Sequence, residues 1–126
     1  DLGVIPYSPL GGGLLTGKYG ALKRPESGRL VENKHYMKRY GAEENYRVAE
    51  RFSEAAAARN VHPATLAVAW VMHHPAVTAP IIGARNLEQL EPSLAAAELS
   101  LSAGERSEIS ALSPEPPLAT DREEER

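Results

Sequence analysis

The 126-residue sequence predicts an α/β fold with a parallel sheet, and two observations lead to this class. Short apolar segments that suit buried strands alternate with longer segments of helical periodicity, as in parallel α/β architectures. The sequence contains only two such strand segments, and two parallel strands would leave open edges on both sides. We therefore expect most of the sheet to come from elsewhere, with this chain as one part of a larger fold.

The first predicted strand covers residues 3–7, where the apolar run Gly-Val-Ile-Pro-Tyr is limited by Pro6 and Pro9. Residues 9–41 follow as a predicted irregular loop that is rich in glycine, proline and charge and shows little periodicity. Irregular segments of this length are uncommon in compact domains unless they bind a ligand. The loop is therefore the first candidate for function.

Two helices and a second strand come next. The first helix is predicted from Glu43 to Arg59 and ends near Asn60, with a buried face of Val48, Phe52, Ala55 and Ala56. Pro63 suits the first turn of a second helix, which His74-Pro75 ends and whose apolar stripe is Leu66, Ala67, Trp70 and Val71. Residues 77–82 are then apolar enough for a second buried strand.

Two capped helices and a polar tail complete the predicted order. Asn86 and Gln89 have the spacing of a capping box, followed by a predicted buried face of Leu87, Leu90, Leu94 and Ala97. Ser102 and Glu105 repeat that spacing before Ile109 and Leu112. Residues 113–126 carry prolines and charge, so we expect a folded part over 1–112 and a disordered acidic tail after it.

Composition narrows the class of protein. Hydrophobic residues make up 42% and charged residues 25%, which is typical of globular proteins, and no run reaches the ~18 apolar residues of a membrane span. The chain contains no cysteine, which excludes disulfides, thiolate metal sites and a cysteine nucleophile. The four histidines lack zinc-like spacing. We expect a cytoplasmic protein that binds neither metal nor membrane.

Positive charge gathers in one segment. Residues 18–42 hold seven basic and two acidic side chains, which gives +5 there and −8 elsewhere for a net charge of −3. Such a segment is suited to a negatively charged ligand. Nucleic acid is disfavoured as that ligand, because the segment has neither a recognition helix nor stacking aromatics on a sheet.

Two motifs carry the candidate chemistry. In the first, residues 5–19 leave a strand and present three glycines and then Lys18, so that consecutive N–H groups and an ammonium group could surround a phosphate. In the second, residues 80–90 place Arg85 after a strand and just before a helix N-terminus, which is itself an anion-binding feature. Ligands of parallel α/β folds bind beyond the carboxyl ends of strands, where both motifs lie.

Over residues 3–112 these segments resemble strands seven and eight of the aldo-keto reductase family, whose motifs "YSPLGGGLLTGKY" and "P-x-x-G-A-R-x-x-x-Q-L" are both matched. The resemblance implies a partial TIM (β/α)8 barrel, NADP(H) as cofactor and hydride transfer to aldehydes or ketones. A complete barrel usually needs about 250 residues. Because the chain is half that length and starts at Asp1 with an apolar run, we expect the C-terminal part of a barrel.

Carried over residue by residue, the resemblance assigns roles along the cofactor. It implies that Tyr7 stacks on the nicotinamide ring. Ser8, Pro9, Leu10, Gly12 and Lys18 belong to the loop that holds the pyrophosphate, and Arg29 closes over the cofactor. It implies that Gly83, Arg85 and Gln89 hold the adenosine end, where Arg85 makes a forked contact to the 2′-phosphate that distinguishes NADP from NAD.

Two departures from the family pattern qualify this assignment. Pro92 and Ser93 stand where the family often has an acidic residue and an asparagine that contact adenine, so weakened or rearranged adenine binding is expected. Pro92 also removes a backbone hydrogen bond and should kink its helix. The family's catalytic Asp, Tyr, Lys and His lie on earlier strands, and none of these four is found in this sequence.

The sequence therefore predicts the cofactor-binding half of an NADP-dependent oxidoreductase that acts on a small carbonyl compound. Two alternatives stay open. One is a non-catalytic NADPH-binding scaffold or sensor, and the other is an inactive truncated chain that is partly unfolded on its own. Whether it is an enzyme, its substrate and its oligomeric state are not determined by these residues.

Overall fold

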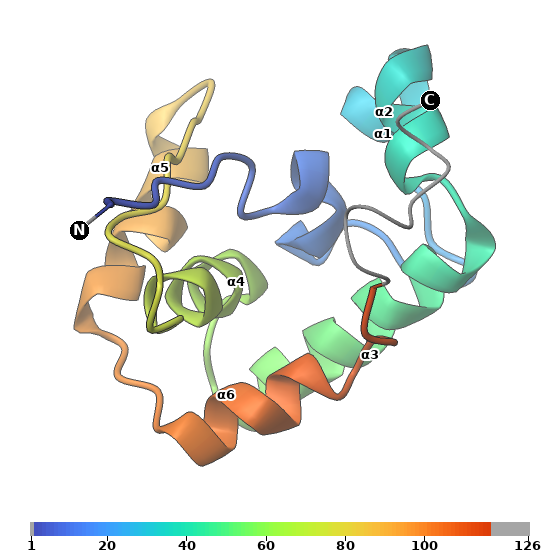
Figure 1. The fold of residues 1–126 in the computed structure, drawn as a ribbon. Helices are drawn as coiled ribbons and strands as arrows, with labels where there is room; N and C mark the ends of the chain where they lie inside the picture. The colour runs from blue at the N-terminus through green and yellow to red at the C-terminus, as the bar shows by residue number, and fades with distance from the viewer. Residues whose placement is uncertain (1, 117–126) are drawn as a thin grey trace.

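The computed structural model describes residues 2–116, and helices dominate this part of the chain. Helix α4 lies at its centre, with α3 and α6 on one side and the N-terminal segment on the other (Figure 1). In chain order the elements are η1 (Gly11–Thr16), α1 (Arg29–Glu32), α2 (Lys34–Tyr40), α3 (Glu43–Ala58), α4 (Pro63–Met72), α5 (Leu87–Leu94), η2 (Ala95–Glu98) and α6 (Ala103–Ser110).

The two predicted strands lie side by side as extended segments that form no regular strand within residues 2–116. The amides of Thr78 and Ile81 donate to the carbonyls of Val4 and Pro6, each at 2.8 Å, and Tyr7 forms one parallel bridge with Ile81. The parallel direction therefore agrees with the prediction. A continuous ladder does not form, because prolines interrupt both segments and the Val4 amide donates to the Thr78 hydroxyl at 3.1 Å.

The predicted irregular loop is wrong for much of residues 9–41, since η1, α1 and α2 lie within it. Glycines allow the first of these turns, because Gly11, Gly12 and Gly13 all have positive φ, at 57°, 67° and 101°. The side chain of Asn33 caps α2 by accepting hydrogen bonds from the amides of His35 and Tyr36. These features lack the apolar periodicity on which the prediction relied.

Helices α3 and α4 form where the sequence predicts them. Asn60, just after α3, adopts φ 54°, the left-handed conformation typical of a helix end, and Pro63 opens α4. The predicted stripe on α4 is too narrow, however, because all residues from Ala64 to Ala69 are buried. Trp70 is only half-buried, and its indole N–H donates to the Ser110 hydroxyl of α6 at 3.0 Å.

The buried face predicted for α5 is wrong at three of its four positions, and only Leu90 is half-buried. Leu87 and Leu94 are exposed, as is Ala97, whereas Ser93 and Ala96 are buried against α4. The Thr65 hydroxyl of α4 donates to the Pro92 carbonyl at 2.6 Å, and small side chains at 93 and 96 permit this close approach of the two backbones. Pro92 lies inside α5, and after Leu94 the chain continues as the 3-10 turn η2.

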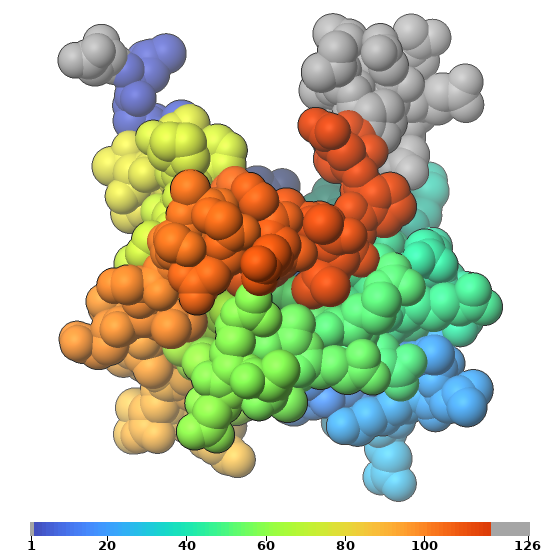
Figure 2. All heavy atoms as spheres, turned by 90° about the horizontal axis from the view of Figure 1, so that it is seen from below, coloured from blue at the N-terminus to red at the C-terminus, as the bar shows by residue number. Residues whose placement is uncertain are grey.

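Helix α6 begins with the predicted capping box. The Ser102 hydroxyl accepts from the Glu105 amide at 3.2 Å, while the Glu105 carboxylate accepts from the Ser102 amide at 2.9 Å. Figure 2 shows α6 lying across α3, and an ion pair of 3.2 Å between Arg59 and Glu108 joins them. Of the predicted tail, residues 117–126 lie outside the part of the chain that the structure describes.

Two apolar clusters hold the helices together. The larger joins α3, α4, η2 and α6 around Phe52, Leu66, Val68 and Ile109. The smaller joins η1, α1 and α3 around Leu14, Tyr19, Leu30, Tyr46 and Ala49, and the side chain of Leu15 packs against both clusters. Because η1 contributes Leu14 to a buried cluster, the glycine-rich turn is anchored at its back by apolar packing.

Candidate functional site

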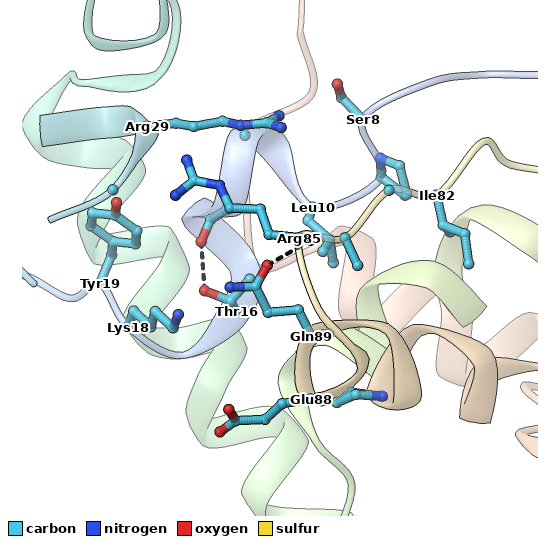
Figure 3. A pocket seen from close by; sticks show the side chains of 18 of the residues that line it. Ser8, Leu10, Thr16, Lys18, Tyr19, Arg29, Ile82, Arg85, Glu88 and Gln89 are labelled. Atoms are coloured by element: carbon cyan, nitrogen blue, oxygen red, sulfur yellow. Dashed lines mark hydrogen bonds between the residues drawn. The ribbon is translucent and has the colours of Figure 1, made fainter. Parts of the chain in front are cut away.

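One pocket brings together every site residue that the sequence predicts. It has a volume of about 670 Å³ and lies between the turn after residue 7, the start of α1 and the segment that leads into α5 (Figure 3). The predicted residues that line it are Tyr7, Ser8, Pro9, Leu10, Gly12, Lys18, Arg29, Gly83, Arg85 and Gln89. Residues more than 60 positions apart thus converge, which supports treating the two motifs as one site.

The glycine turn differs in one respect from the expected ring of free N–H groups. The Gly11 amide donates to the Ser8 carbonyl at 3.0 Å and the Gly13 amide to the Leu10 carbonyl at 3.1 Å. These two amides already donate to carbonyls of the chain, so the prediction that they surround a phosphate was wrong. A ligand can still approach the backbone of the turn closely at Gly13, since a β-carbon added there would meet no atom within 4 Å.

A tyrosine from α2 covers the back of the turn. A β-carbon added to Gly12 would lie 2.5 Å from the Tyr36 ring, so glycine is required there by direct packing. The Tyr36 hydroxyl also accepts a hydrogen bond of 3.4 Å from the Arg29 guanidinium, whose carbon lies 5.5 Å from the ring centroid. Tyr36 therefore couples the glycine turn to Arg29, a role that no sequence motif indicated.

Three basic side chains give the pocket a positive character. Lys18 follows the glycine turn, Arg29 opens α1 and Arg85 precedes α5 (Figure 3). Among the described residues none of the three forms an ion pair with a carboxylate. Basic side chains that form no ion pair within residues 2–116 are suited to an anionic ligand.

The start of α5 is organised by its own side chains. The Asn86 side chain accepts from the Gln89 amide at 3.0 Å, which is the first half of the predicted capping box. The second half is absent, because the Gln89 side chain accepts from the Arg85 amide, at 3.2 Å, in place of the amide of the cap residue Asn86. This bond ties Gln89 to the backbone at Arg85, so the two predicted site residues hold each other in place.

Buried aromatic packing supports the side of the pocket that carries Arg29. Burial raises the pKa of the Tyr19 phenol above its usual range, and the neighbouring Leu30 backbone offsets part of this rise. The Tyr19 ring lies 6.0 Å from that of Tyr46, over which the Arg24 guanidinium sits at 3.3 Å. Gly28 adjoins the Tyr19 hydroxyl, where any side chain would collide with it.

His62 and Glu88 are among the polar residues of the pocket that sequence reasoning missed. The signal for His62 was its place before Pro63, because the residue before a first-turn proline is the helix cap. Its Nδ1 atom accepts a hydrogen bond of 3.0 Å from the Ala64 amide. Glu88 adjoins Gln89 in sequence, and only that proximity could have indicated it.

Within residues 2–116, none of the helices combines the length and apolar character that a bilayer crossing requires. Over the same range, histidine and acidic side chains nowhere gather in threes that could ligate a metal ion.

Comparison with known proteins gives a consistent result. The model of the aldo/keto reductase family matches residues 1–114. The chain is 39% identical over 100 residues to "Uncharacterized oxidoreductase YrpG" of Bacillus subtilis, covering 79% of the chain and 28% of that protein. It is 34% identical over 95 residues to "Aldo-keto reductase" of Babesia bovis, covering 74% and 33% respectively. The chain thus spans about a third of the length of the curated relatives it matches.

Proposed function

The chain belongs to the aldo/keto reductase family, and on that premise we propose that its pocket binds NADP(H) for an oxidoreductase that reduces aldehydes or ketones. The family implies a TIM-barrel fold, a nicotinamide cofactor and small-molecule substrates. Within that fold we assign residues 1–112 to strands seven and eight with their helices. We further propose that the protein works in the cytoplasm as part of a complete barrel.

The observation that carries the proposal is the convergence of both motifs on one pocket with three basic side chains that form no ion pair with any acidic residue in the described part of the chain. A dinucleotide with a 2′-phosphate presents several negative charges along its length, which such a pocket suits. The residues also fit its bulk, since added side chains at Gly13 and Gly83 would meet nothing within 4 Å. The open backbone at both positions leaves room for a ligand to approach closely.

Along the pocket we assign Tyr7 to the nicotinamide, the turn from Ser8 to Lys18 to the pyrophosphate, and Arg85 with Gln89 to the 2′-phosphate end. Arg29, held by Tyr36, would close over the cofactor. When bound, the nicotinamide supplies the hydride. The residues of this chain contribute by positioning and electrostatics, because they fix where the ring lies and neutralise the phosphates.

We infer that the proton that accompanies the hydride comes from a residue outside these 126, because the family's catalytic Asp, Tyr, Lys and His are not found in this sequence. Among the tyrosines of this chain, Tyr19 and Tyr46 are buried in the smaller cluster and Tyr36 packs on the glycine turn. None of these three is placed as an acid facing a substrate. This observation also favours a second candidate, an NADPH-binding protein without chemistry, and turnover of an aldehyde by the whole protein would distinguish the two.

Titration of the purified chain with NADPH and NADH, followed by nicotinamide fluorescence, tests the cofactor assignment. We expect tighter binding of NADPH, and Arg85→Ala should weaken NADPH binding by ~10–100-fold while leaving NADH almost unchanged, because a forked charge-assisted contact is lost. Arg47→Ala, an exposed position on α3 away from the pocket, is the matched control. Equal affinity for both dinucleotides, or no binding, would contradict the proposal.

A further inference from the structure

Glu88 does not fit the positive character of the pocket. It is the only acidic side chain among the residues that line the cavity, where Lys18, Arg29 and Arg85 provide positive charge. A carboxylate beside a phosphate would oppose its binding by charge repulsion. If the pocket holds a polyanion, the Glu88 carboxylate therefore suits a part of the ligand that carries no negative charge and can donate a hydrogen bond.

The position of Glu88 in the pocket indicates which part of the ligand it would contact. In Figure 3 its carboxylate lies at the opposite end of the pocket from Ser8, below Gln89. Glu88 also lines a second cavity of about 520 Å³, which shares only Glu88, His62 and Pro92 with the first. These three residues mark the junction of the two cavities, and this junction adjoins the end that we assign to the adenosine.

His62 supplies a donor at the same junction. Its Nδ1 atom is the acceptor for the Ala64 amide, at 3.0 Å, and an atom that accepts from an N–H carries no proton. In the neutral ring the proton therefore sits on Nε2. The side chain is exposed and lines both cavities, so the junction offers one acceptor, the carboxylate, and one donor, the imidazole N–H.

We propose that this pair recognises the adenine ring. Adenine carries an exocyclic amine, which donates, and on the same edge the ring nitrogen N7, which accepts. The Glu88 carboxylate would accept from the amine, and the His62 Nε2–H would donate to the ring nitrogen. This inference rests on the proposed function, and it identifies residues for adenine at the end where the Ser93 side chain is buried and makes no hydrogen bond.

A purely structural role for Glu88 makes a different prediction. Glu88 lies in the first turn of α5, where a negative charge stabilises the helix through its dipole. That role would alter stability when the charge is removed, but it would not distinguish one base from another. The test is therefore the ratio of affinities for two dinucleotides that differ only in the base.

The experiment titrates the purified chain with NADPH and with its hypoxanthine analogue, in which a carbonyl oxygen replaces the amine. We expect the wild-type chain to prefer NADPH by about tenfold, since an acceptor facing an acceptor loses a charged hydrogen bond. In Glu88→Gln the ratio should fall close to one, because an amide can rotate to donate to the carbonyl. Glu91→Gln, on the same helix and lining only the second cavity, should keep the wild-type ratio.

The outcomes separate the two proposals. An unchanged ratio in Glu88→Gln, with NADPH still bound, would overturn the role of Glu88 and leave the cofactor assignment intact. Failure of the wild-type chain to bind either dinucleotide would overturn both. Thermal unfolding followed by circular dichroism accompanies each titration, and a Glu88→Gln protein that folds like the wild type and loses base preference would establish the inference.

Discussion

Two residues of the glycine turn have backbone conformations that most residue types avoid. Ser8 has φ 57° although it is not glycine, and Gly12 has φ 67° beneath the Tyr36 ring. Left-handed conformations cost an ordinary residue about 1–2 kcal/mol, and such strain persists where the surrounding structure requires it. At residue scale, the turn is therefore shaped by contacts with α2 as well as by its own glycines.

Gly12→Ala tests this packing. We expect the substitution to lower the free energy of unfolding by ~2–4 kcal/mol, because left-handed strain adds to a collision with the ring. In a Tyr36→Ala background the same substitution should cost only the strain, which leaves a coupling energy of about 1–3 kcal/mol between the two positions. Urea unfolding of the four proteins measures this cycle, and additive costs would show that Tyr36 does not press on Gly12.

At the scale of elements, helices with local signals could be predicted and contacts between backbones could not. Pro63 and the box of Ser102 with Glu105 are signals contained in a few residues, and α4 and α6 begin where they indicate. The buried face of α5 depends instead on how closely its backbone approaches α4 through Thr65. No periodicity within α5 itself encodes that approach, so its leucines were misplaced.

The candidate site shows the same division. Nine of its ten residues could be predicted because two contiguous motifs carry them, Arg29 was predicted from the wider family resemblance, and the structure brings all ten to one pocket. Tyr36 could not, because it packs on Gly12 from a separate helix, whereas His62 lies outside both motifs and Glu88 occupies a position that the second motif leaves unspecified. The committed amides of Gly11 and Gly13 were also missed, since a glycine run does not reveal whether it forms turns.

The capping box of α6 predicts a specific dependence on pH. Hydrogen bonds from the Ser102 amide and hydroxyl hold the pKa of the Glu105 carboxyl below its usual range. A lowered pKa in the folded state means that this contribution to stability is present above the unfolded value of about 4.3 and is lost as pH falls through the folded value. Acid should therefore weaken the start of α6.

Ser102→Ala removes the hydroxyl and should lower the free energy of unfolding at pH 7 by about 1 kcal/mol, as for other helix caps. It should also raise the pKa of Glu105 toward its usual value, since one of the two donors is lost. Urea unfolding and an NMR titration of the Glu105 carboxyl measure the two effects. An unchanged Glu105 titration in the variant would contradict the assigned hydrogen bond.

At the scale of the whole molecule, apolar side chains along the extended segments and α5 have no partners within the described residues. Ile5 is 61% exposed, Ile81 53% and Leu87 72%. We expect the chain alone to unfold with low cooperativity, because the two segments are joined by one bridge and their other edges are unpaired.

Thermal unfolding with and without NADPH tests this expectation. Ligand that binds only the folded state should raise the midpoint, with ~2.7 kcal/mol of stabilisation at a hundredfold excess over Kd. Arg85→Ala should show little of this shift and so serves as the control. A sharp monomeric transition that NADPH does not move would contradict both the incomplete packing and the cofactor site.

The contact between Trp70 and α6 has an optical consequence. The chain contains a single tryptophan, whose indole donates to Ser110 and lies 5.0 Å from the Arg106 guanidinium. Trp70 does not line the pocket. Its fluorescence should therefore report the docking of α6 on α4, while nicotinamide fluorescence reports occupancy of the pocket. Folding and binding can then be followed at separate emission wavelengths in one sample.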